Sequence, residues 1–134
     1  MRKLLLSFAL VAAAAPAAVP VPPQSRWSTL PRLQLRPGAK ASTAWIEKAR
    51  ALAKDGTCTF ATTADGTTRL EIPFIVLTSP RGTVTAAEVA DTGCAPLEAM
   101  VAGIAKTLRA VPLPAPKGAP PQWRYSRFVA GWRA

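Results

Sequence analysis

The chain has 134 residues, a length that limits it to one domain with a tail. It carries 17 lysines and arginines against 7 acidic residues, a formal net charge of +10, and no histidine. The lack of histidine removes the commonest general base and metal ligand. The positive charge favours anionic partners through long-range steering, but its scattered arrangement lacks the repeated basic and aromatic motif of nucleic-acid binders, so no nucleic acid is expected.

Residues 1–17 are predicted to form a cleaved signal peptide. Arg2 and Lys3 precede an apolar stretch at residues 4–15, and Ala15-Pro16-Ala17 supplies a small-residue cleavage pattern. The alternative is an uncleaved anchor, but a membrane span needs roughly 20 apolar residues and this stretch is shorter. Cleavage predicts a periplasmic or secreted protein that does not span the membrane.

Residues 18–41 contain five prolines and show no sustained period, which is typical of an extended linker. The folded domain is therefore expected at residues 42–134. It opens with a helix capped by Ser42 or Thr43, which ends near Gly56. The apolar face of this helix comprises Trp45, Ile46, Ala49, Leu52 and Ala53.

Three stretches of strand are predicted next. A short β-rich run at residues 57–63 turns at residues 64–66 and pairs with a long strand at residues 67–79. Pro73 within that strand cannot donate to a ladder, so it marks an edge, a bulge or a division into two strands. After a turn that closes on Gly82, residues 83–92 form the return strand. The alternation that defines the long strand comes from Leu70, Ile72, Phe74 and Val76.

A second helix and a last strand complete the domain. Pro96 suits the first turn of the helix, and Glu98 suits the positive end of its dipole. A proline-rich spacer from Val111 ends the helix, and residues 122–132 form a terminal aromatic strand. The helical spacing is set by Leu97, Met100, Val101, Ile104, Ala105 and Leu108.

These elements predict an α+β fold. We expect a small two-layer domain with a three- to four-stranded, mainly antiparallel sheet packed by two helices. Its two cysteines, Cys58 and Cys94, are expected to form a disulfide, because an exported chain meets an oxidising compartment. The alternative is a free, reactive Cys94 thiol beside a helix start.

The pattern from Leu70 to Trp132 resembles the carboxy-terminal domain of TonB-like proteins, the periplasmic end of bacterial energy transducers. Gly82-Thr83-Val84 stands at the turn, Asp91-Thr92-Gly93 replaces a Ser-Ser-Gly-like loop, Leu97-Glu98 opens the helix, and Pro112-Leu113-Pro114 forms the exit. The resemblance implies a periplasmic recognition fold. Because such transducers need an uncleaved anchor, the resemblance leaves a part in energy transduction open. Domains of this kind can dimerise by exchanging strands, which the sequence leaves open.

No catalytic constellation is visible in the sequence, and we expect no enzyme, metal or cofactor. The seven acidic residues are spread singly, and no phosphate-binding loop, serine-centred elbow or metal-ligand spacing is present. A thiol-active enzyme would require a free Cys94 with Lys106 as its base. Binding is the chemistry that remains.

The last strand is the candidate binding edge. An unpaired edge accepts an extended peptide as an extra strand, the mode called β-augmentation. The predicted function is a soluble periplasmic module that binds a segment of an envelope protein or outer-membrane receptor in this way. The alternative is a structural envelope protein held to anionic lipid or polymer by its charge. The competing interpretation is that the aromatic residues of this strand belong to the core and that its arginines are only solvated. The edge residues are Trp123, Arg124, Tyr125, Arg127, Phe128 and Trp132.

Overall fold

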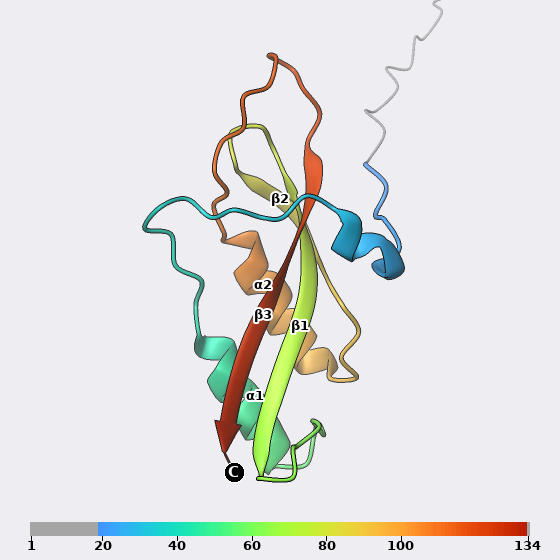
Figure 1. Cartoon of the computed structure of the whole chain (residues 1–134), viewed down its shortest axis with the longest axis vertical. Coiled ribbons are helices and arrows are strands. Elements are labelled where there is room, and N and C mark those ends of the chain that lie inside the picture. Colours follow the sequence, from blue (N-terminus) through green and yellow to red (C-terminus); the bar gives the residue numbers. More distant parts are fainter. Residues whose placement is uncertain (1–18, 134) are drawn as a thin grey trace, which may run out of the picture.

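The computed structural model describes residues 19–133, so the signal peptide expected at residues 1–17 lies outside the described part. Two α-helices, a 3₁₀-helix and a three-stranded sheet make up this part (Figure 1). Among the described residues, no helix is long and apolar enough to cross a membrane. In chain order the elements are η1 (Gln24–Thr29), α1 (Ala44–Lys54), β1 (Thr67–Thr78), β2 (Val84–Val89), α2 (Ala95–Lys106) and β3 (Gln122–Arg133).

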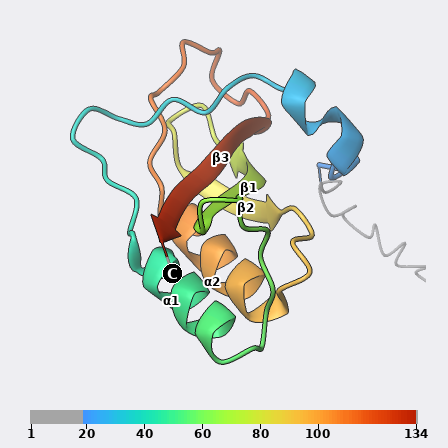
Figure 2. The same cartoon turned by 60° about the horizontal axis from the view of Figure 1, so that its bottom comes forward.

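The sheet is antiparallel with the order β2-β1-β3, so β1 is the central strand. Strand β1 pairs with β3 over its whole length, from Thr67 opposite Arg133 to Thr78 opposite Gln122. The shorter β2 pairs only with the second half of β1. Both α-helices lie on one face of this sheet (Figure 2). The α+β prediction, a small two-layer domain with an antiparallel sheet and two helices, is confirmed.

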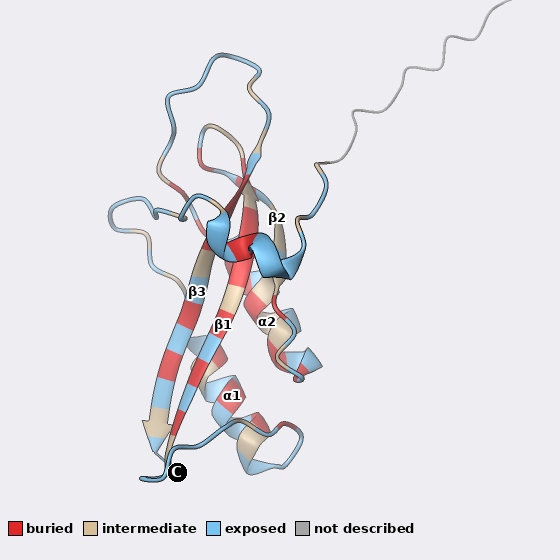
Figure 3. Cartoon of the chain, turned by 45° about the vertical axis from the view of Figure 1, so that its right-hand side comes forward, coloured by how far each residue is buried: buried red, intermediate tan, exposed pale blue. Residues whose placement is uncertain are grey.

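The period-two alternation of β1 and β3 gives the sheet two different apolar faces. Toward the helices, Ile72, Phe74 and Val76 are fully buried against Leu97 and Val101. The opposite face carries a smaller cluster under η1 at one end of the sheet (Figure 3). That second cluster consists of Trp27, Ile75, Ala90, Trp123 and Tyr125.

Within residues 19–41, expected as an extended linker, Trp27 packs against the sheet and residues 31–33 lie beside β3. Trp27 in η1 is only 5% exposed, and its indole N–H donates to the Pro22 carbonyl. The Trp123 indole donates in turn to the Pro20 carbonyl at 2.9 Å. The sequence showed no period here because one tryptophan, rather than a repeating face, anchors a proline-stiffened segment.

Pro73 lies within the continuous strand β1, so the predicted bulge or division at this residue is wrong, whereas the predicted edge holds on one side, because regular pairing with β2 ends beside Pro73. Its carbonyl accepts the Ala90 N–H at 2.9 Å, on the side of β1 that faces β2. Because the N and C=O of one residue in an antiparallel strand point to the same side, the missing donor also faces that side. Regular pairing with β2 ends at Phe74 opposite Val89, so the ladder to β3 loses no donor.

The turns follow the expected positions. Gly82 closes the turn after β1, with its N–H donating to the Ser79 carbonyl and a φ of 88°. A Cβ at this position would lie 2.0 Å from the Ala110 carbonyl oxygen, so only glycine fits. The run at residues 57–63 forms a single bridge, Thr62 to Thr68, and no strand. The return strand is shorter than predicted and ends at Val89.

Replacing Trp27 with alanine tests whether the amino-terminal segment is part of the fold. We expect Trp27→Ala to lower the free energy of unfolding by about 3 kcal/mol, because it removes a buried aromatic side chain. The matched control Val21→Ala changes a half-exposed residue of the same segment, and it should change the free energy of unfolding by less than about 0.5 kcal/mol. Urea denaturation measures both. Equal, small effects would mean that the segment does not contribute to stability.

Candidate binding edge

The outer side of β3 is paired at one end and open at the other. Near the start of the strand, the Leu33 N–H donates to the Tyr125 carbonyl at 2.8 Å, and the Tyr125 N–H donates to the Pro31 carbonyl at 3.0 Å. Because backbone groups alternate sides along a strand, Arg127, Val129 and Gly131 also direct their N–H and C=O groups away from β1. Within residues 19–133, no backbone hydrogen bond reaches this side of those three residues. We call residues 127–133 the open edge.

Most aromatics of the candidate binding edge belong to the core. Phe128 stacks on Phe74 with ring centroids 4.5 Å apart and also contacts Trp45. Trp123 and Tyr125 are buried on the opposite face with Trp27. For these three aromatics the structure supports the core interpretation, because both faces of this part of β3 are covered.

The two arginines of the candidate edge differ. Arg127 is exposed, and its guanidinium lies 3.6 Å from the Glu71 carboxylate, which also lies 3.6 Å from Arg69. Such exposed ion pairs contribute little to stability. Arg124, in contrast, is buried, with only 8% of its surface exposed, and its Nε donates to the Thr78 hydroxyl. A solvated role therefore fits Arg127 and does not fit Arg124.

Trp132 is the one half-buried aromatic of the six predicted residues. Its ring meets Phe60 edge-on, with centroids 6.2 Å apart, at the end of the open edge. A hollow of about 590 Å³ lies beside it. Its lining combines apolar rings with three cationic side chains and contains no acidic residue: Phe60, Trp132, Arg50, Lys54 and Arg133, together with Ala53, Gly56, Cys58, Thr59, Thr62 and Thr68.

Sequence reasoning missed Val129, Gly131 and Arg133, which face outward along the open edge. Val129 is 47% exposed and is the apolar side chain most available to a partner. Strand alternation would have separated these odd-numbered residues from the buried Phe128. The aromatic residues drew attention instead, although their size suits a core equally well.

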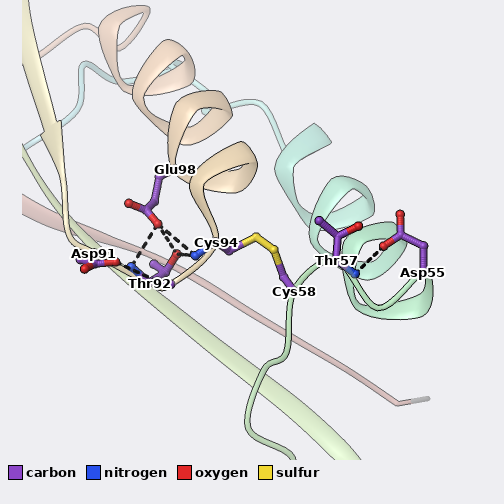
Figure 4. The surroundings of a disulfide bond; sticks show 8 residues. Asp55, Thr57, Cys58, Asp91, Thr92, Cys94 and Glu98 are labelled. Atoms are coloured by element: carbon purple, nitrogen blue, oxygen red, sulfur yellow. Dashed lines mark hydrogen bonds between the residues drawn. A yellow bond between two sulfur atoms is a disulfide. The ribbon is translucent and has the colours of Figure 1, made fainter.

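The predicted disulfide is confirmed. Cys58 and Cys94 are joined with their Cα atoms 5.6 Å apart, and both are buried. Cys58 follows α1 and Cys94 is the N-cap residue of α2, so the bond ties the two helices together under the sheet (Figure 4). The alternative of a free Cys94 thiol is wrong for this structure, since both cysteines are in the bond.

Glu98 organises the chain that leads into the disulfide (Figure 4). Its carboxylate accepts hydrogen bonds from the Thr92 N–H, the Thr92 hydroxyl and the Cys94 N–H, at 3.3, 3.0 and 3.1 Å. Asp91 accepts the Gly93 N–H one turn earlier. These acidic side chains thus satisfy backbone donors at the helix start, which is a structural role.

Two further acidic residues, Asp55 and Asp65, stabilise turns, and their pKa values are lowered. The hydrogen bond from Thr57 lowers the pKa of Asp55 below its ordinary value of 3.8. The hydrogen bond from Thr63 does the same for Asp65, which also accepts the Thr67 N–H. No group of three or more metal-ligating side chains occurs in the described part of the chain.

Comparison with models of protein families, with curated proteins and with solved structures finds no match to this chain. The resemblance to the TonB carboxy-terminal domain therefore stays a prediction.

Removing the disulfide should destabilise the fold strongly. The cysteines are 36 positions apart, and closing a loop of this length contributes about 4 kcal/mol in the chain-entropy model. We expect the Cys58→Ala, Cys94→Ala double variant to lose about this much unfolding free energy in urea denaturation. Wild-type protein reduced with dithiothreitol is the control and should show a similar loss. Stability unchanged by either treatment would contradict a structural role of the bond.

Acidification should release the turns held by Asp55 and Asp65. Because hydrogen bonding lowers the folded-state pKa of each carboxyl, its contribution to stability is present above 3.8 and is lost as the pH falls through the lower folded value. The measurement is an NMR titration of the Thr57 and Thr67 amide protons below pH 5. Both signals should shift upfield with midpoints below 3.8, and Asp65→Asn should abolish the transition at Thr67 only.

Proposed function

We propose that the chain is an exported recognition module that binds an extended peptide by adding it as a strand to the open edge of β3. The partner is a segment of an envelope protein or outer-membrane receptor. One observation carries this proposal. On the outer side of β3, the backbone of Tyr125 already forms hydrogen bonds with Pro31 and Leu33, whereas the outward backbone groups of Arg127, Val129 and Gly131 have no such partner in residues 19–133.

The amino-terminal segment leaves room for such a peptide. After Leu33 the chain turns from β3 toward residues 109–111, where Leu35 bridges to Ala110 and the Val111 N–H donates to the Gln34 carbonyl. The open edge therefore begins where this segment departs. A peptide of four or five residues would cover it, and each new backbone hydrogen bond would contribute about 1 kcal/mol.

The charge around the open edge favours an acidic peptide. Arg127 and Arg133 lie along the edge, and Arg50 and Lys54 line the hollow at its end. Glu71 is the acidic residue opposite them, and it already faces two arginines. Steering by these charges would speed the encounter, while backbone pairing would hold the peptide.

The setting of this proposal comes from the sequence. The predicted signal peptide supports a periplasmic or secreted location, and the resemblance to TonB-like domains suggests an outer-membrane receptor as the partner. The competing function is a cationic envelope protein that adheres to anionic lipid or polymer. Such adhesion would need no peptide and would weaken steeply with salt.

Proline scanning of the open edge separates these two functions. Val129→Pro removes an outward N–H at an exposed position, whereas Phe128→Pro would break the ladder to β1 and disturb the core. A photo-crosslinking amino acid in place of Arg127 captures partners in cells, and mass spectrometry identifies them. We expect receptor or plug segments to be captured, and Val129→Pro to reduce their yield at least tenfold.

The matched control is Val129→Thr, which keeps the N–H and the β-branched shape and should preserve capture. Circular dichroism should show that both variants are folded. Equal capture by the folded proline variant would refute strand addition at this edge. Capture of lipid alone, lost in high salt, would establish the cationic envelope function in its place.

A further inference from the structure

Arg124 is a buried cation at the opposite end of β3 from the hollow. The residue is 8% exposed, although a guanidinium is among the groups least often buried without a partner. Its Nε donates to the Thr78 hydroxyl at 3.2 Å, and that hydroxyl donates to the Gln122 carbonyl at 3.3 Å. The Thr78 hydroxyl thereby fixes one side of the guanidinium plane.

The charge of Arg124 has no counter-charge. None of the ion pairs in residues 19–133 involves it. The seven acidic residues all lie within that range, and six of them accept hydrogen bonds or form ion pairs elsewhere: Glu47, Asp55, Asp65, Glu71, Asp91 and Glu98. The seventh, Glu88, is exposed on β2.

The two terminal nitrogens of Arg124 are also without hydrogen-bond partners in the described residues. Every side-chain nitrogen or oxygen that is sealed from solvent does have a partner, so these two nitrogens must reach open space. Arg124 lines a cavity of about 110 Å³ beneath the proline-rich spacer between α2 and β3. An arginine with two unpartnered terminal nitrogens therefore lines a small, partly open cavity.

The walls of this cavity are mainly apolar. Pro80, Leu113, Pro114 and Pro120 supply most of them, and Ser79 and Gln122 add polar groups. The Ser79 oxygen accepts the Thr83 N–H, which leaves its own hydroxyl proton free to donate. The cavity thus offers one full positive charge, a fork of N–H donors and hydrophobic sides.

We propose that this cavity is a binding site for a carboxylate group attached to a small apolar body. A carboxylate matches the guanidinium fork with two parallel hydrogen bonds and supplies the missing negative charge. A phosphate dianion would bring more charge than one arginine balances in an apolar space. The ligand is either a free short-chain carboxylic acid or the carboxyl terminus of a peptide with an apolar last residue.

Sodium propionate is the first probe of this site. An NMR titration follows the side-chain Nε–H signals of the arginines at constant ionic strength, set with sodium chloride. We expect the Arg124 signal to shift saturably with a millimolar or tighter dissociation constant, while the exposed Arg127 signal stays in place. A linear drift, or equal shifts at both arginines, would overturn the proposal without any need for a variant.

Two variants give an independent test. Arg124→Met keeps the length of the side chain without its charge, and Arg127→Met makes the same change at an exposed position. The melting temperature should rise with propionate for the wild type and for Arg127→Met, because a ligand that binds only the folded state stabilises it. Arg124→Met should show no such rise. A rise equal to that of the wild type would refute the assignment.

Peptides distinguish the two sources of the carboxylate. A tetrapeptide ending in a free leucine carboxylate is compared with the same peptide carrying a carboxy-terminal amide. At least tenfold tighter binding of the free acid, and tighter binding than propionate, would identify a peptide terminus as the ligand. Binding of propionate alone would identify a small carboxylic acid. Val129→Pro should leave the affinities for propionate and for the peptide unchanged. The proposals of a carboxylate site and of strand addition are therefore tested independently.

Discussion

The antiparallel pairing of β1 with β3 over twelve residues determines the rest of the structure. This register places Phe128 opposite Ile72 and so assigns every other side chain of both strands to the helix-covered face. A slip of one residue would expose that entire set. The same alternation directs the backbone of Val129 outward, so the position of the core and the existence of the open edge follow from one register.

The charges of the chain have distinct structural assignments. Asp55, Asp65 and Glu98 satisfy backbone donors at turns and at a helix start, where a negative charge is favourable. Four cations lie along the end of β3 and around the hollow beside it: Arg127, Arg133, Arg50 and Lys54. Arg124 is the exception, because it is buried and takes part in none of the ion pairs of residues 19–133. An arginine in that position is more readily explained by binding than by stability.

Several features could be predicted because they depend on neighbours in the sequence. The turn at Gly82, the helix that begins after Cys94 and the alternation around Ile72 reflect local backbone preferences and periodicity. Other features were decided by distant residues. Of the three alternatives for Pro73, only the edge fits, because β2 ends beside it. Residues 57–63 form only a bridge, and Trp27 anchors the segment expected as a linker from the far face of the sheet.

The sequence by itself determined the fold class, the two helices and the disulfide partners, because hydrophobic period, turn residues and cysteine count can be read without the fold, whereas the edge position of the last strand follows from the strand order β2-β1-β3. Only the tertiary structure decided which groups of that edge are free. Trp123 and Phe128 pack against opposite faces, residues 31–33 occupy the edge at Tyr125, and the spacer lines a cavity together with Arg124. Exposure depends on segments that meet across the sheet, which no pattern within a single strand records.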